Sequence, residues 1–118
     1  MTTKFTLLFA ALFCSLFAAA ADIRVTDADL IGGQTYDWTA DNVYILDGLV
    51  YLEEGGVLNI EAGTTIKGAT SITTGDNTSA LIITRGARIV ARGTASAPII
   101  FTAEEDDLSD SGDFTAQD

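Results

Sequence analysis

Four consecutive acidic residues near the end of the chain are the first candidate for metal chemistry. They are Glu104, Glu105, Asp106 and Asp107, and Asp110, Asp113 and Asp118 follow them. Carboxylate oxygens in such number are the ligands that a hard cation such as calcium takes. The chain lacks both the EF-hand spacing and the glycine-rich nonapeptide that bind calcium elsewhere. A calcium site at Glu104–Asp107 is therefore one expectation, and a solvated acidic loop or tail is the alternative that we favour.

Proton abstraction by a basic residue is a second candidate chemistry. Arg85, Arg88 and Arg92 are the residues available for it. Two of them have charge partners in the repeat described below, and no second acidic set lies near them. The chain has no histidine, so it lacks the commonest general base and the commonest transition-metal ligand. We therefore identify no catalytic residue and expect no cofactor apart from the calcium considered above.

Two further groups of residues are candidates for binding. The first lies in a polar loop, where solenoid proteins often carry recognition residues, although an ordinary turn is the alternative. It comprises Asp76, Asn77, Thr78 and Ser79. The second is aromatic and comprises Tyr36, Trp38, Tyr44 and Tyr51. Aromatic faces stack on sugar rings, but we favour the interpretation that these residues cover the open end of the fold.

The start of the chain predicts export. Lys4 precedes an apolar run over 5–17, and four alanines at 18–21 lead into Asp22. This is the pattern of a signal peptide cleaved after Ala20 or Ala21, and the run is shorter than the roughly 20 residues of a membrane span. The only cysteine, Cys14, would leave with residues 1–21. We expect a secreted or cell-surface protein with no membrane span and no disulfide after cleavage.

The charge of the chain excludes one class of partner. All 17 acidic residues follow the predicted signal peptide, and five basic residues remain to oppose them, which gives a formal charge of −12. A surface of this sign repels nucleic acid and anionic lipid. We expect no nucleic-acid partner.

The elements that would position these residues are short strands in a repeat. An offset of about 31 residues aligns apolar positions with one another and one bend glycine with another. It pairs Val50 with Leu81, Leu52 with Ile83, Gly55 with Gly86, Leu58 with Ile89 and Ile60 with Ala91. It also places Arg85 over Glu54 and Arg92 over Glu61, which predicts two ion pairs. An offset of about 30 aligns Gly63 with Gly93 but puts Leu58 on Arg88, so we prefer the first.

The repeat predicts an all-β parallel solenoid. Its rungs extend over 43–103 after a lead-in and amino-terminal cap at 22–42, and an acidic loop or tail occupies 104–118. The polar segment 69–79 is an inserted loop, and without it a rung would have roughly 20 residues. Antiparallel hairpins are the main alternative, but two-residue hairpin turns are absent except at Asp47-Gly48.

Three segments carry a resemblance to a known family. They are GGVLNIEAGTTIKG at 55–68, RGARIVARGT at 85–94 and APIIFT at 97–102. They resemble the amino-terminal rungs of large secreted bacterial proteins with a right-handed parallel β-helix of the pectin-lyase-like kind. Those relatives are several times longer, which implies that this chain is a truncated form whose missing rungs would follow residue 118. Two rungs alone would leave an apolar end and an unpaired edge exposed.

This resemblance is specific for the fold and nearly silent on function, because such helices host lyases, hydrolases and adhesins. We expect a non-enzymatic extracellular or cell-surface segment with a structural, adhesive or glycan-contacting role. The alternative is the front portion of a polysaccharide lyase or hydrolase whose catalytic rungs lie beyond this chain.

Overall fold

A computed structural model describes residues 21–109, which form nine short strands and one turn of 3-10 helix. In chain order the elements are β1 (Ala21–Val25), η1 (Asp27–Asp29), β2 (Thr35–Trp38), β3 (Asn42–Leu46), β4 (Leu49–Leu52), β5 (Val57–Ile60), β6 (Thr65–Gly68), β7 (Ala80–Ile83), β8 (Arg88–Ala91) and β9 (Ile100–Ala103). Nearly all of the predicted signal peptide lies outside the described residues. Within 21–109 there is no helix of the length and hydrophobicity needed to cross a bilayer.

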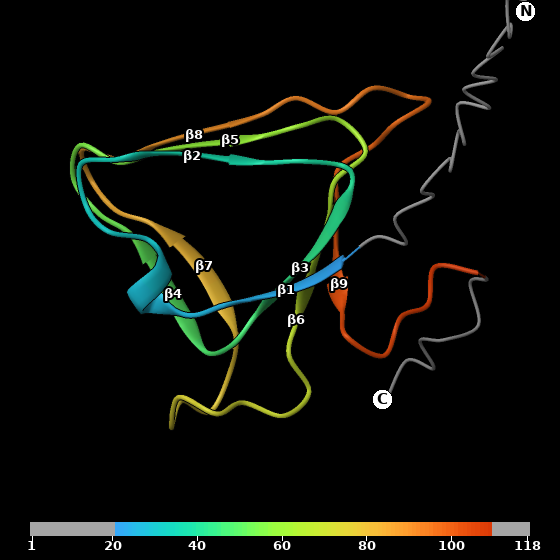
Figure 1. The fold of residues 1–118 in the computed structure, drawn as a ribbon, viewed down its shortest axis with the longest axis horizontal. Coiled ribbons are helices and arrows are strands. Elements are labelled where there is room, and N and C mark those ends of the chain that lie inside the picture. The colour runs from blue at the N-terminus through green and yellow to red at the C-terminus, as the bar shows by residue number, and fades with distance from the viewer. Residues whose placement is uncertain (1–20, 110–118) are drawn as a thin grey trace, which may run out of the picture.

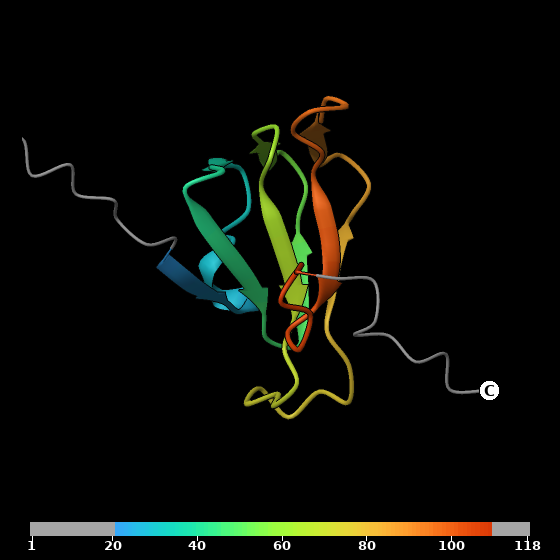
Figure 2. The same ribbon diagram turned by 90° about the vertical axis from the view of Figure 1, so that its right-hand side faces the viewer.

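The strands form three sheets around a triangular cross-section (Figure 1). The sheet orders are β1-β3-β6-β9, β2-β5-β8 and β4-β7, and every pairing is parallel. Consecutive strands therefore belong to different sheets, and each of the strands β1 to β6 pairs with the strand one turn of the chain later. Figure 2 shows these turns stacked side by side along the molecule. The arrangement confirms the predicted parallel β-solenoid and excludes the hairpin alternative.

The strand register confirms the preferred repeat offset. Val50 pairs with Leu81 and Leu52 with Ile83 between β4 and β7, and Leu58 pairs with Ile89 between β5 and β8. At the bend, the backbone N–H of Gly55 donates to the Gly86 carbonyl at 2.9 Å. The repeat was visible in the sequence because equivalent positions in stacked strands share the same side of the solenoid wall.

The first rung begins earlier than the sequence pattern indicated. The segment 22–42 contains most of β1, which pairs with β3, and all of β2, which pairs with β5. Thr35 lies opposite Val57, and Tyr36 lies opposite Leu58. Their outward positions carry charged residues such as Arg24 and Asp37, and these interrupt the apolar pattern. The strands were therefore missed in the sequence, although Tyr36 and Trp38 alternate as inward residues do.

The core runs through the middle of the triangle. Val50, Leu52 and Leu58 are fully buried, and Ile66 is only 1% exposed. These side chains alternate with outward residues along β4, β5 and β6, as the period of a strand requires. Because the inward positions stack from rung to rung, they form one continuous apolar column.

Candidate functional site

The loop at 69–79 is the largest departure from the regular rung. In the preceding rung only Asp47 and Gly48 separate β3 from β4, whereas residues 69–79 separate β6 from β7. The loop hangs from the corner between these two sheets (Figures 1 and 2). It lies beside the Asp47-Gly48 corner, since the two connections occupy equivalent places in neighbouring rungs.

Asp47 is the centre of the contacts that hold this loop. Its side chain is 1% exposed, and one carboxylate oxygen accepts hydrogen bonds from Arg24 Nε at 2.9 Å and Thr73 Oγ1 at 2.5 Å. The other oxygen accepts from the backbone N–H of Thr73 at 2.7 Å. The bonds from Thr73 and from Arg24 lower the pKa of Asp47 to about 2. The carboxylate is therefore charged and fully engaged at neutral pH.

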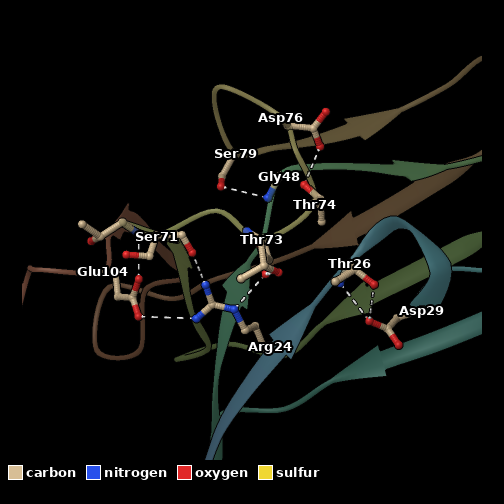
Figure 3. Close-up of polar contacts among 12 residues, drawn as sticks. Arg24, Thr26, Asp29, Gly48, Ser71, Thr73, Thr74, Asp76, Ser79 and Glu104 are labelled. Carbon is tan, nitrogen blue, oxygen red and sulfur yellow. Dashed lines mark hydrogen bonds and ion pairs between the residues drawn. The ribbon is translucent and has the colours of Figure 1, made fainter.

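Two more side chains attach the far end of the loop to the same corner. An oxygen of Asp76 accepts from the backbone N–H of Leu49 at 2.9 Å and from Thr74 Oγ1 at 2.8 Å, and both bonds lower its pKa. Ser79 Oγ accepts from the backbone N–H of Gly48 at 3.1 Å. Figure 3 shows the contact between Ser79 and Gly48 and the contact between Asp76 and Thr74. The loop thus supplies acceptors for backbone N–H groups at the start of β4.

Arg24 and Glu104 fix the near end of the loop. The guanidinium of Arg24 donates to the Ser71 carbonyl and lies 3.9 Å from the Glu104 carboxylate (Figure 3). Glu104 in turn accepts from the backbone N–H of Thr70 at 2.7 Å. One cation from β1 and one acid after β9 therefore meet at this loop, although 80 positions separate them in the sequence.

Of the four predicted binding residues in the loop, two hold it in place and two project. Asp76 and Ser79 are partly buried by the contacts just described. Asn77 and Thr78 are exposed between them, with no side-chain hydrogen bond to the described part of the chain. Together with this projecting pair, the anchored loop is the candidate site. The anchors Arg24, Asp47 and Thr73 were not found from the sequence, because the Asp-Gly dipeptide indicated only a turn.

The predicted calcium ligands have separate protein partners. Asp106 is 7% exposed and accepts from Thr102 Oγ1 at 2.6 Å and from the Leu108 backbone N–H at 2.8 Å, and these bonds lower its pKa. Glu104 lies near the Arg24 guanidinium and accepts from the backbone N–H of Thr70 in loop 69–79. Among residues 21–109, no group of three or more histidine, cysteine or acidic residues is placed to hold a metal ion. Asp110, Asp113 and Asp118 lie outside the described residues, so the calcium site stays a prediction.

The two predicted ion pairs of the repeat are wrong. In the described part of the chain both salt bridges involve Arg24. Glu61 instead accepts from the backbone N–H of Ala40 at 2.8 Å. The side chain of Glu54 occupies the space that a Cβ on Gly86 would need. The register is as predicted, but Glu61 bonds a nearby backbone N–H and Glu54 packs beside Gly86, so neither forms an ion pair with the arginine of the next rung. Arg85 and Arg92 are exposed.

The burial of Trp38 and Tyr44 removes both rings from the proposed sugar-binding platform. Trp38 and Tyr44 are each 5% exposed, and their rings stack with centroids 4.6 Å apart. The Tyr44 hydroxyl accepts from the backbone N–H of Thr39 at 2.9 Å. Tyr36 packs against the same core and bonds the backbone of Ile31. The rings of Trp38 and Tyr44 therefore fill the interior of the first rungs, whereas Tyr51 alternates with the buried Val50 and Leu52 of β4 and is half-buried on the outer face.

Comparison with known proteins agrees with this architecture. A family model described as a pectate-lyase-like beta helix domain matches residues 32–115, which is most of the chain. No curated protein and no solved structure matches the chain.

Proposed function

The chain belongs to the pectate-lyase-like β-helix domain family, and from that premise we propose that it is a non-enzymatic extracellular or cell-surface segment that contacts a glycan through loop 69–79. The solenoid serves as a rigid support. The loop supplies the contact, because it is longer than the other connections between strands within the described residues.

The single observation that carries this proposal is the attachment of the loop through Asp47. A buried carboxylate that accepts three hydrogen bonds, two of them from Thr73, holds the loop backbone in one conformation. Ordering a loop in advance removes part of the entropic cost of binding. Because Asn77 and Thr78 are then presented on a fixed frame, they can act as a specific contact.

The chemistry of the projecting pair favours a neutral, hydroxyl-rich ligand. An asparagine amide and a threonine hydroxyl each donate and accept hydrogen bonds, as sugar hydroxyls do. The formal charge of −12 expected after signal-peptide cleavage opposes binding of anionic polymers. A neutral glycan satisfies both conditions.

Export supports the same proposal. The predicted signal peptide at 1–21 would deliver the chain to a compartment where cell-surface glycans are found. Pectate-lyase-like β-helix domains are commonly extracellular.

The test is glycan binding by the full chain, expressed for export and recovered from the secreted fraction. We expect binding to neutral glycans on an array, and loss of at least tenfold in affinity for the double variant Asn77→Ala, Thr78→Ala. Ser96→Ala, in the other exposed polar connection, is the matched control and should bind as the parent does. Equal binding by the loop variant would overturn the proposal. Release of unsaturated sugars from an acidic polysaccharide by the parent chain would instead support the lyase alternative.

A further inference from the structure

The outer face of the sheet formed by β4 and β7 carries only apolar and aromatic side chains. Leu49 and Tyr51 alternate with the two fully buried residues of β4, so they face outward. They pair with Ala80 and Ile82 of β7, which places all four side chains on one face. All four are partly exposed. We call this face the apolar wall.

The other two sheets differ, because their outward positions include charged side chains. Among the described strands these are Asp22, Arg24, Asp37, Lys67 and Arg88. A contiguous apolar surface with a polar rim is typical of a binding site. Because the rungs of a solenoid add along its axis, further rungs would lengthen the apolar wall and would not cover it.

Loop 69–79 adjoins the apolar wall. Asp76 accepts a hydrogen bond from the backbone N–H of Leu49 at 2.9 Å, and β7 begins directly after the loop. In Figure 1 the loop, drawn in yellow, extends to the outer side of β4 and β7. Thr78 precedes Ile82 by four residues, so their α-carbons lie at most about 14 Å apart. One extended ligand can therefore contact both the loop and the wall.

Tyr51 offers both a ring and a polar group at the far end of the wall. Its backbone N–H donates to Asp27 Oδ1 at 2.9 Å, and its hydroxyl has no hydrogen-bond partner within the described residues. Asp27 is exposed, and so is Glu53, which follows Tyr51 by two residues. Arg85, beyond the end of β7, is also exposed. Hydrogen-bond acceptors and donors therefore border this end of an apolar surface.

We propose that the apolar wall is the second part of a glycan site, where the ring of Tyr51 stacks on the CH face of a neutral sugar. Other sugars of the same chain contact Asn77 and Thr78, so this inference rests on the glycan contact proposed above. A pyranose with equatorial hydroxyls has apolar faces and polar edges. The faces fit the wall, and the edges meet the polar groups around it.

The shape of the wall favours a chain of sugars over a single sugar. No enclosed pocket is found in the described part of the molecule, so one sugar would be contacted on one side only. A chain gathers contacts from several rings along the wall and the loop. A β-1,4-linked glucose chain has equatorial hydroxyls in every ring, and it is the class of ligand that the wall fits.

The experiment uses the full chain recovered after export, with cellohexaose as the probe. We expect nuclear Overhauser contacts between the ring protons of Tyr51 and the CH protons of the sugar. Tyr51→Ala should weaken binding by about tenfold, whereas Tyr51→Phe keeps the ring and should stay within about threefold of the parent. The matched control is Val57→Ala, which shortens an outward apolar side chain on the neighbouring sheet and should bind as the parent does.

Circular dichroism checks that each variant keeps its β signal. Binding by Tyr51→Ala with the affinity of the parent would overturn the stacking proposal, and loss of binding by Asn77→Ala, Thr78→Ala would then leave the loop proposal standing. A parent that binds other neutral glycans but not cellohexaose would also overturn the stacking proposal alone. A parent that binds no neutral glycan would overturn both.

Discussion

The Asp47 carboxylate accepts a hydrogen bond of 2.7 Å from the backbone N–H of Thr73, 26 residues further along the chain. This bond joins a two-residue corner of one rung to the inserted loop of the next. It explains how an 11-residue polar segment at 69–79 remains attached to the solenoid. It also makes the candidate site depend on one buried side chain.

The first prediction concerns the order of this loop. The substitution Asp47→Asn replaces one acceptor oxygen of the carboxylate with an NH₂ donor. This donor cannot accept the hydrogen bonds that Arg24 and Thr73 donate. We expect the backbone N–H of Thr73 to exchange with solvent at least tenfold faster, and the thermal midpoint to fall. Hydrogen exchange measured residue by residue is the test. The backbone N–H of Leu58 is the internal control, and unchanged protection at Thr73 would contradict the role of Asp47.

A second prediction follows from the lowered pKa of the same group. Asp47 has a pKa of about 2 in the folded chain, against 3.8 without its partners. The charged Asp47 carboxylate therefore contributes its full stabilisation of the folded state above about pH 4. This contribution is lost as the pH falls through the folded pKa of about 2. The pKa values of Asp76 and Asp106 are also lowered, so they act in the same direction.

We expect the urea midpoint of unfolding to decline steadily between pH 4 and pH 2, and to be flat from pH 5 to pH 7. Asp47→Asn should show a shallower decline over the acidic interval, because it lacks the titrating group. A midpoint that rises on acidification, or a variant as steep as the parent, would contradict the assignment.

The third prediction is that position 48 requires glycine. Gly48 has a φ of 82°, and a Cβ at this position would overlap Thr74 Oγ1 and Asp76 Oδ2. Gly48→Ala should therefore cost about 1–2 kcal/mol from the left-handed backbone alone. It should also displace the loop. Gly75→Ala is the matched control, since that glycine has a φ of 92° but open space around it. Equal destabilisation by the two variants would mean that the loop does not pack against the corner.

The sequence predicted the repetitive part of the fold and missed the parts that depend on single polar contacts. The pairing of Leu58 with Ile89 was accessible because stacked rungs repeat their apolar positions. The contacts of Asp47 were not, since nothing about a turn aspartate identifies a threonine 26 residues away as its partner. Likewise, Glu61 does not form the expected ion pair, because its carboxylate accepts a hydrogen bond from the nearby backbone N–H of Ala40. Register follows from periodicity, whereas side-chain partners follow from local geometry.

The last prediction concerns the first rung. Trp38 is the only tryptophan of the chain and stacks on Tyr44 inside the core. Its fluorescence should therefore be blue-shifted in the folded protein and should move to longer wavelength on unfolding. Trp38→Ala should cost about 3–5 kcal/mol, as expected for loss of a buried indole. Trp38→Phe keeps a stacking ring and should cost clearly less, which separates packing from a general effect of substitution. Solvent-like emission from the folded chain would show that β2 is not packed on β5 and that the first rung does not close the apolar column.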